Sequence, residues 1–372
     1  MFTKFNLKDY NFKLLALVII AVVTGIIVIN SANDSFTSRQ IIGAVLGLIA
    51  MLFISVINYD FVCKFYGILY IINLVLLTLV LLVGVNVNNA TRWINIGGDG
   101  GIQFQPSEFS KQFMIIFAAT LLAKFKDSDK INTFKCLATF AAFSGLCLLL
   151  IVSEPDLSTT ICLTLVLVTM LYVSGLSYKI IGLALLILVP LGGSFLWYIQ
   201  RPDQILLKDY QVKRILQFIY PAEYGVEYSQ QNNSIMAIGS GQLTGKGLNT
   251  STIATVKDAN FISEQQTDFI FSVIGEELGF VGSVIIIAII LLIVLQCIHV
   301  ARNAKDTKGM LLATGVASLI AYQAFINISV ATGVLPNTGI PLPFISYGLS
   351  SLLSVMAGMG IVLNISLQRS KY

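Results

Sequence analysis

Long apolar runs alternate with short polar connections along the whole chain. A helix needs about 20 mostly apolar residues to cross the ~30 Å hydrocarbon layer of a membrane, and these runs approach or exceed that length. Ten runs are predicted to be helices, at residues 14–30, 41–58, 65–85, 107–123, 136–152, 157–174, 180–199, 269–298, 310–333 and 348–366. The pattern therefore predicts an all-α integral membrane protein with about ten transmembrane helices.

Composition favours a single membrane domain. Hydrophobic residues make up 56% of the 372 residues and charged residues 11%, and the mean hydropathy is +0.84. No polar or charged block is long enough for a separate soluble module, so residues 1–372 are predicted to form one polytopic domain. No small-residue cleavage site follows the first run, which favours a membrane helix over a signal peptide.

The positions of lysine and arginine predict the orientation of the helices. Basic residues gather near both ends of the chain and in alternate connections, at Lys4, Lys8, Lys13, Lys124, Lys126, Lys130, Lys135, Arg302, Lys305, Lys308, Arg369 and Lys371. Basic connections stay in the cytoplasm, so both termini are predicted to be cytoplasmic. The long connection at about 200–267, between the seventh and eighth helices, is then extracytoplasmic. This bias accounts for the formal net charge of +4, and no nucleic-acid partner is predicted.

Cysteine and histidine usage excludes several kinds of chemistry. The five cysteines lie in or beside apolar runs, without a metal-binding or redox spacing, at Cys63, Cys136, Cys147, Cys162 and Cys297. His299 is the single histidine. One histidine cannot build a histidine metal cluster, and at the cytoplasmic end of the eighth predicted helix it cannot serve an outward-facing serine-histidine triad.

Two segments of the long extracytoplasmic connection carry cations. If DYQVKRI is helical, Lys213 and Arg214 lie on its polar side, where they either anchor the helix at the membrane surface or face anionic head groups. The segment AIGSGQLTGKG, residues 237–247, lacks the spacing of a phosphate loop. Its Lys246 either belongs to a flexible glycine-rich turn or contacts a diphosphate.

Two other outer connections place charge beside helix starts. Arg92 precedes the motif PSEFSK, in which Glu108 and Lys111 are three residues apart. Such a pair contributes little if exposed, and marks a site or pathway if buried. Asp156, in SEPDLSTT, either caps the sixth helix or belongs to a site. The uncharged connection LPNTGIPLPFISYG is predicted to be a rigid loop packed across the bundle.

The segment ISEQQTDFIFSVIGEELGF carries four carboxylates in a chain with few charges. On a helix, Glu264, Asp268, Ser272 and Glu276 form one polar stripe, because they are four residues apart. Asp268 stands at the start of the eighth helix, where it either caps the helix or acts in a site. Glu276 and Glu277 lie deeper, where an acid costs about 2.5 to 3.5 kcal/mol, and both are predicted to be satisfied within the bundle.

These segments together resemble a known family. The motifs RWI…FQPSEFSK, EPDLSTT, DYQVKRI, AIGSGQLTGKG, TDFIFSVIGEELG and LPNTGIPLPFISYG are similar, in order and spacing, to those of the SEDS family, typified by RodA, FtsW and SpoVE. The resemblance covers nearly the whole chain. The compact chain and its short tails favour the rod-shape-determining type of the family, typified by RodA. The sequence departs from the family at Ser263 to Gln266, where Pro-Glu-x-His is usual, and at Glu154, where Gln is common.

The resemblance implies a peptidoglycan glycosyltransferase of the bacterial cytoplasmic membrane. Such an enzyme polymerises lipid II, the undecaprenyl-diphosphate-linked disaccharide pentapeptide, at the outer face of the membrane. Asp268, in the Thr-Asp-Phe motif, is implied to be the catalytic residue. The expected substrate-binding positions are Arg92, Glu108, Lys111, Asp156, Arg214, Lys246 and Glu264. The implied partner is a class B penicillin-binding protein, a transpeptidase with a single membrane span.

The chemistry of this reaction suits one carboxylate and several cations. A carboxylate such as Asp268 can act as general base towards the attacking sugar hydroxyl, and diphosphate is already a good leaving group. Its developing charge calls for cations, supplied by arginine and lysine or by a divalent cation such as Mg²⁺ or Mn²⁺, and the sequence leaves both open. Two other functions stay open: a flippase for the lipid-linked precursor, and a non-catalytic scaffold. The outward clustering of the polar motifs argues against both.

Overall fold

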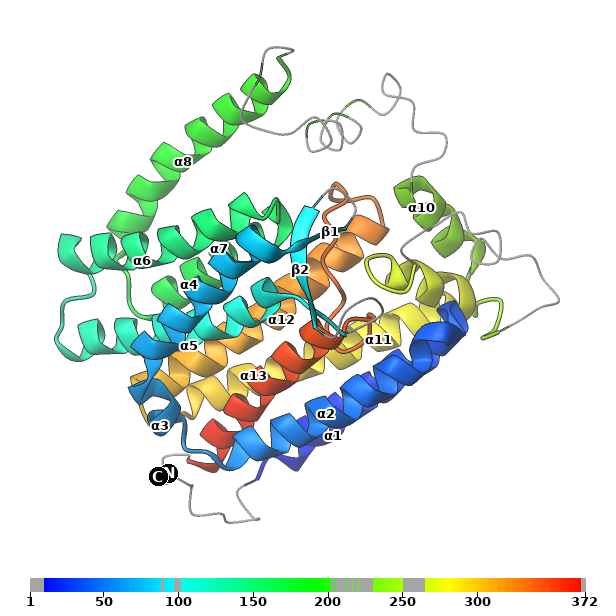
Figure 1. Ribbon diagram of the computed structural model, residues 1–372, viewed down its shortest axis with the longest axis horizontal. Helices are drawn as coiled ribbons and strands as arrows, with labels where there is room; N and C mark the ends of the chain where they lie inside the picture. Colours follow the sequence, from blue (N-terminus) through cyan, green and yellow to red (C-terminus); the bar gives the residue numbers. More distant parts are fainter. Residues whose placement is uncertain are drawn as a thin grey trace.

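The computed structural model describes residues 10–87, 90–96, 102–201, 204, 212, 216, 220, 230–249 and 265–368. Its helices are α1 (Phe12–Ala32), the short 3-10 helix η2 (Asp34–Phe36), α2 (Thr37–Val56), α3 (Tyr59–Lys64), α4 (Tyr66–Val83), α5 (Pro106–Asp127), α6 (Phe134–Ser153), α7 (Leu157–Val173), α8 (Tyr178–Ile199), α10 (Gln230–Ser240), α11 (Ile270–Arg302), α12 (Thr307–Ala331) and α13 (Leu349–Leu367). Three short strands are β1 (Val85–Val87), β2 (Ala90–Ile96) and β3 (Ile102–Phe104). Figure 1 shows most of the helices packed into one bundle, with α8 standing apart from it.

Each of the ten predicted apolar runs coincides with a long helix: α1, α2, α4, α5, α6, α7, α8, α11, α12 and α13. In the part of the chain that the structure describes, eight helices are long and apolar enough to cross a membrane. Of the other two, α7 has only 17 residues and α5 carries several charged side chains. The predicted fold class, an all-α membrane protein, is confirmed.

Alternating helix directions give the bundle two distinct ends. The basic end, as we call it, joins the start of α12 to the end of α13 through α3. There the Tyr59 amide donates to Asn364 Oδ1 at 2.9 Å, and the Tyr59 hydroxyl donates to Asp306 Oδ1 at 3.0 Å. Lys124, at the end of α5, donates to the Tyr66 hydroxyl at 3.0 Å. The starts of α4 and α12 and the ends of α5 and α13 therefore lie together.

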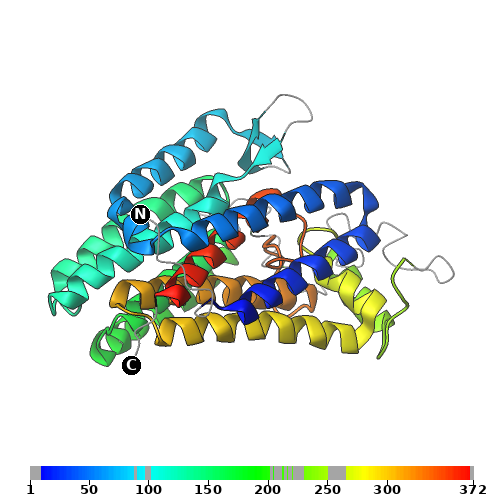
Figure 2. The ribbon, with the colours of Figure 1, turned by 90° about the horizontal axis from the view of Figure 1, so that it is seen from below.

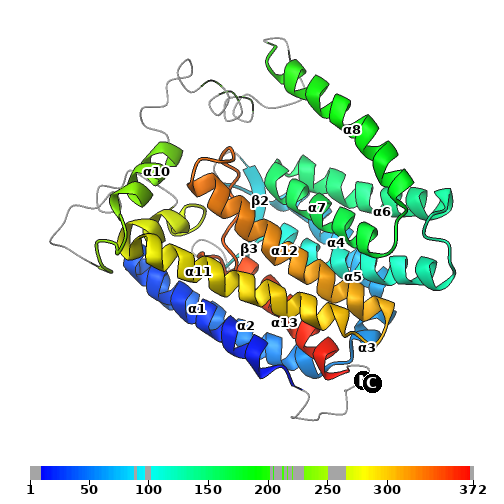
Figure 3. The same cartoon turned by 180° about the vertical axis from the view of Figure 1, so that it is seen from behind.

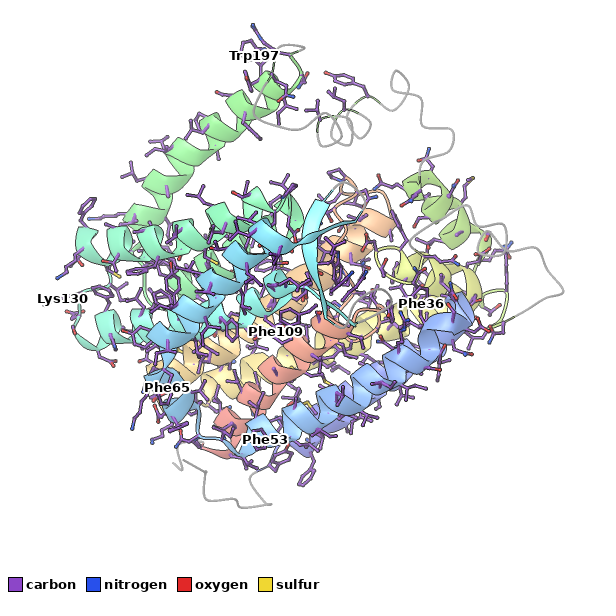
Figure 4. The ribbon with its side chains drawn as sticks, viewed as in Figure 1. Phe36, Phe53, Phe65, Phe109, Lys130 and Trp197 are labelled. Carbon is purple, nitrogen blue, oxygen red and sulfur yellow. The ribbon has the colours of Figure 1, made fainter. Side chains whose placement is uncertain are left out.

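The opposite end, which we call the motif end, carries the connections singled out in the sequence. The Ser31 hydroxyl at the end of α1 donates to Glu277 Oε1 of α11 at 2.7 Å, and Gln265 Nε2 donates to the Ala32 carbonyl at 3.1 Å. Figure 4 labels Phe36 at this end and Lys130 at the basic end, with the length of the bundle between them. The sequence-predicted separation of basic connections from functional motifs is thus present in the fold.

Helices α12 and α13 form the centre of the bundle. In their most apolar 18-residue windows, 67% of the α12 residues and 83% of the α13 residues are buried. Small residues permit this close packing, as expected where lipid gives no hydrophobic drive for helix association. A Cβ on Gly315 of α12 would lie 2.6 Å from Cγ2 of Ile115 on α5. Figure 2 shows α13, in red, enclosed by the surrounding helices.

Helix α8 differs from the other long helices because it stands away from the bundle. None of the residues in its most apolar window is buried. Figures 1 and 3 both show it leaning outward from the neighbouring α6 and α7. Trp197, near its far end, has a side chain that is exposed and stacks on Arg201, whose guanidinium carbon lies 4.2 Å from the ring centroid.

Helix α11 contains a break that the hydropathy pattern did not predict. Gly279 has φ 66° and ψ −163°, a conformation that residues with a Cβ rarely adopt. The amides of Phe280 and Val281, freed by the break, donate to the carbonyls of Gln242 and Leu243 at 2.9 and 3.1 Å. Within a membrane protein such amides need a partner, so the turn after α10 completes α11.

Gly25 on α1 lies where the loop of residues 334–348 packs on the bundle, so a substitution there tests how close that packing is. A Cβ at Gly25 would lie 2.6 Å from the Phe344 carbonyl oxygen and 2.8 Å from the Ile345 Cα, so the main chain must move to admit it. We expect Gly25→Ala to lower stability by about 1–3 kcal/mol, measured as thermal unfolding in detergent.

Gly145→Ala on α6 is the matched control, since a Cβ there meets nothing within 4 Å. Alanine is the better helix former by about 1 kcal/mol, so this variant should equal or exceed the wild type. Equal melting temperatures for the two variants would contradict the close packing of α1 on the loop.

Candidate active site

Asp268 lies in the turn that leads into α11. The helix starts at Ile270, and Phe269 rather than Asp268 occupies the N-cap position. The Asp268 side chain is half-buried, whereas Phe269 and Ile270 are fully buried. Asp268 therefore stands one position before the N-cap, and its half-buried carboxylate lies at the motif end of the bundle.

A single amide side chain holds the main chain around Asp268. Asn327 of α12 donates from Nδ2 to the Asp268 carbonyl at 2.8 Å and to the Ile340 carbonyl at 2.7 Å. Asn327 is 1% exposed, so this double contact is protected from water and lipid. It joins three segments: α12, the turn before α11, and the loop of residues 334–348.

The loop of residues 334–348 makes further contacts with this turn. The Ser346 hydroxyl donates to the Thr267 carbonyl at 2.6 Å, and the Tyr347 amide donates to the Gln266 carbonyl at 2.9 Å. Ser346 Oγ also accepts from the Leu342 amide at 2.7 Å, which closes the loop on itself. The loop therefore packs across the bundle, as the sequence predicts, and its rigidity stays a prediction.

Gly339 lies directly against the Asp268 carboxylate. Its φ is +77°, and a Cβ placed there would lie 3.2 Å from Asp268 Oδ2. Glycine therefore serves both the left-handed turn and the close approach of main chain to carboxylate. The orientation of Asp268 depends on this loop as well as on the turn that carries it.

Arg92 and Asp156 meet at the motif end, from β2 and from the turn between α6 and α7. Arg92 Nη1 lies 3.7 Å from Asp156 Oδ1, and its other nitrogens donate to the Glu154 and Pro155 carbonyls. Asp156 also caps α7, accepting from the Thr159 amide at 3.1 Å. The capping role weighed for Asp156 is therefore confirmed, and the same carboxylate also pairs with Arg92.

Glu108 and Lys111 form a buried ion pair at the start of α5. Lys111 Nζ lies 2.7 Å from Glu108 Oε1, and the residues are 1% and 3% exposed respectively. Glu108 Oε2 is buried and accepts no hydrogen bond. The sequence left open whether this pair is exposed, and the structure shows that it is buried, which is the case that marks a site.

Two hydroxyls connect these groups to one another. The Ser107 hydroxyl, next to Glu108, donates to Asp156 Oδ2 at 3.4 Å. The Ser158 hydroxyl donates to the Thr338 carbonyl, immediately before Gly339. The Arg92–Asp156 pair, the start of α5 and the Asp268 turn therefore belong to one connected polar region.

Lys246 is held by the first of the two deep glutamates. Its Nζ lies 2.7 Å from Glu276 Oε1 and its amide donates to the Glu276 carbonyl at 3.0 Å. Glu276 and Glu277 are 1% and 2% exposed, and Glu277 accepts from Ser31. The prediction that these acids are satisfied within the bundle is confirmed for Glu276, which pairs with Lys246, and only in part for Glu277, whose Oε1 accepts from Ser31. The glycine-rich turn is docked instead of free.

Two candidates from the sequence, Arg214 and Glu264, lie outside the described residues, as does Lys213. In the part of the chain that is described, no three His, Cys, Asp or Glu side chains come together as a metal site.

The sequence-based search missed Glu154 as a site residue. It is fully buried in the turn between α6 and α7, and neither carboxylate oxygen has a hydrogen-bond partner. Burial, with a smaller effect of Asp156, raises the pKa of Glu154 to about 8, while Arg92 acts in the opposite direction. The sequence does carry a signal for Glu154 that could have found it: an acid directly before Pro-Asp, at the end of an apolar run.

Fold and site together define a polytopic helical membrane protein with an ionisable site at one end of its bundle. The chain belongs to the FtsW/RodA/SpoVE family, because the family model described as "Cell cycle protein" matches residues 7–371.

Proteins of known name are similar over nearly the same length. Stage V sporulation protein E of Bacillus subtilis is 34% identical over 98% of this chain and 99% of its own. A probable peptidoglycan glycosyltransferase FtsW of Trichlorobacter lovleyi is 33% identical over 97% of this chain and 94% of its own. The peptidoglycan glycosyltransferase MrdB of Escherichia coli K12 is 36% identical over 81% and 77%. These similar identities favour no single branch of the family.

Two solved structures have the same fold. One, reported as "Structural coordination of polymerization and crosslinking by a peptidoglycan synthase complex", matches with a TM-score of 0.80 and 26% identity over 96% of this chain and 97% of its own. The rod shape determining protein RodA of Thermus thermophilus matches with a TM-score of 0.70 and 25% identity, over 98% of both chains.

The buried ion pair on α5 can be tested by a double-mutant cycle. Lys111→Met leaves the Glu108 carboxylate buried without its cation, and we expect a loss of about 3–5 kcal/mol of stability in thermal unfolding. Adding Glu108→Gln removes the buried charge and should restore most of that loss. If the double variant is as unstable as the sum of the single variants, the two side chains are not coupled.

Proposed function

We propose that this protein is a peptidoglycan glycosyltransferase that polymerises lipid II into glycan strands. The observation that carries the proposal is the Asp268 carboxylate, held against Gly339 and connected through the loop to the Arg92–Asp156 pair. Support also comes from membership of a family with relatives named as peptidoglycan glycosyltransferases.

Asp268 acts as the general base in this proposal. The 4-hydroxyl of one sugar attacks the anomeric carbon of the next, and Asp268 takes up the hydroxyl proton as the new bond forms. Asn327 and Gly339 orient the Asp268 carboxylate: Asn327 holds the Asp268 main chain, and Gly339 leaves space beside the carboxylate. Undecaprenyl diphosphate leaves from the anomeric carbon, so a second carboxylic acid is not needed.

Cations at the motif end stabilise the charge that develops on the diphosphate. Arg92 is the best placed of the described candidates, since its side chain is 22% exposed and its partner Asp156 lies 3.7 Å away. Lys111 is buried in its pair with Glu108, so it acts through the local field. Arg214, Lys246 and Glu264 complete the proposed substrate-binding set.

A divalent cation, Mg²⁺ or Mn²⁺, is the other proposed source of positive charge. The described carboxylates do not form a three-ligand site for it, so the reaction above is written through arginine and lysine. Removal of divalent cations with EDTA, followed by addition of Mg²⁺ or Mn²⁺, separates the two sources. Full activity in EDTA supports the protein's own cations, and loss with recovery supports the metal.

The proposed orientation places the basic end in the cytoplasm and the motif end outside. The basic end, with Lys124 and Lys308, then faces the cytoplasm. This agrees with the excess of lysine and arginine on the cytoplasmic side of membrane proteins. The site lies on the outer side of the cytoplasmic membrane, where glycan strands are built. A class B penicillin-binding protein is the proposed partner, supported by the fold match to a peptidoglycan synthase complex.

Polymerisation should be lost in Asp268→Asn. The variant keeps the size of the side chain and removes the proton acceptor, so the rate should fall by a factor of about 10² to 10⁴. The measurement is glycan polymer formed from labelled lipid II by protein reconstituted in vesicles with its transpeptidase partner.

Asp34→Asn is the matched control, because Asp34 is exposed on η2 at the same end of the bundle. It should polymerise like the wild type. Polymer formed by Asp268→Asn at the control rate would refute the assignment. Exchange of lipid II between leaflets without polymer, in the wild type, would identify a flippase instead.

A further inference from the structure

Glu154, in the polar region of the proposed active site, is an acid whose carboxylate has no hydrogen-bond partner. Its side chain is fully buried, and both carboxylate oxygens lack a hydrogen-bond partner. Its own carbonyl accepts from Arg92 Nε at 3.4 Å, so the residue adjoins the cation that we assign to the diphosphate. A buried carboxylate with no donor is costly when ionised and much less so when protonated.

The groups around Glu154 do not supply a cation of its own. Arg92 from β2 is shared with the Asp156 carboxylate and two main-chain carbonyls. On α5, Lys111 is taken by Glu108 at 2.7 Å. On α6, Cys147 is a buried thiol in contact with Asn73 and Ser110, and it supplies no positive charge.

The net charge of the cluster formed by Arg92, Asp156 and Glu154 therefore depends on one proton. With Glu154 neutral, Arg92 and Asp156 balance each other. With Glu154 ionised, the cluster carries one net negative charge beside the proposed diphosphate position. A diphosphate brings further negative charge, and like charges in a partly desolvated site repel strongly.

We propose that Glu154 is a positioning residue whose carboxyl must hold its proton for Arg92 to engage the diphosphate of the lipid substrate. This inference rests on the proposed function for the identity of the ligand. Binding of the diphosphate then takes up a proton from solution onto Glu154 once the free protein has begun to lose it.

The direction of the pH effect follows from the burial of Glu154. Its pKa is raised to about 8 in the free protein, so the carboxyl is neutral below that pH and ionises above it. The bound anion raises the pKa of Glu154 further, because it disfavours the second negative charge. Affinity is thus full below pH 8 and falls above it, by up to about tenfold per pH unit for one linked proton.

Undecaprenyl diphosphate alone is the probe for this linkage, because it tests binding without turnover. We expect its dissociation constant for the wild type, in detergent or nanodiscs, to rise about tenfold between pH 7 and pH 9. In calorimetry with buffers of different ionisation enthalpy, binding should take up close to one proton at pH 8.5 to 9 and almost none at pH 7. Absence of proton uptake in the wild type would overturn the inference without any variant.

Glu154→Gln should bind the probe with nearly the same affinity at pH 7 and at pH 9. Glutamine keeps the size of the side chain but cannot ionise, whereas a merely structural role would shift affinity equally at all pH values. Asp60→Asn, the same change at the basic end, should retain the wild-type pH dependence. An equal pH dependence in Glu154→Gln and the wild type would refute the role of Glu154.

The same proteins separate this inference from the proposed function. Polymer formation without a Glu154-dependent change in binding leaves the glycosyltransferase standing and rejects the linkage. Proton-linked binding of undecaprenyl diphosphate by a protein that forms no polymer leaves the linkage standing and rejects the glycosyltransferase. The two failures are therefore distinguishable.

Discussion

The bond pair made by Asn327 is the interaction on which the rest of the site depends. One buried amide donates to the carbonyls of Asp268 and Ile340, and so holds the start of α11 and the loop of residues 334–348 in one position. That loop brings Gly339 to the Asp268 carboxylate and accepts the Ser158 hydroxyl from α7. The loop thus connects the turn that carries Asp268 with the segment that carries Asp156 and Arg92's other main-chain partners.

Pairing of charge is the second constraint, imposed by the membrane. The described ion pairs at the motif end each join one cation to one carboxylate: Arg92 with Asp156, Lys111 with Glu108, and Lys246 with Glu276. An unpaired charge in such surroundings costs several kcal/mol, so these pairs make the motif end compatible with burial. A diphosphate must then share cations that are already in use. A buried Glu154 without a hydrogen-bond partner gives this nearly neutral region a means of adjusting its charge.

Local patterns predicted the helices well and the site in part. Hydropathy is a property of consecutive residues, so all ten apolar runs coincide with long helices. The spacing of Glu108 and Lys111 predicted their pairing, because residues three apart meet on a helix. The partner of Glu276 was not predictable, since Lys246 lies 30 positions earlier and arrives through the docking of a turn on the break at Gly279. The N-cap position falls on Phe269, which makes no side-chain cap bond, because α11 begins one residue later than the pattern indicated.

The sequence by itself determined the membrane class, the helices, the separation of basic connections from polar motifs, and the residue types available for chemistry. These follow from composition and short-range spacing, which act before any long-range contact forms. The tertiary structure alone decided which charges are buried, which acid meets a cation from a distant segment, and that the Glu154 carboxylate has no hydrogen-bond partner. Those properties arise where distant segments pack together, and the energy of a charge depends on the neighbours and the water that packing leaves around it.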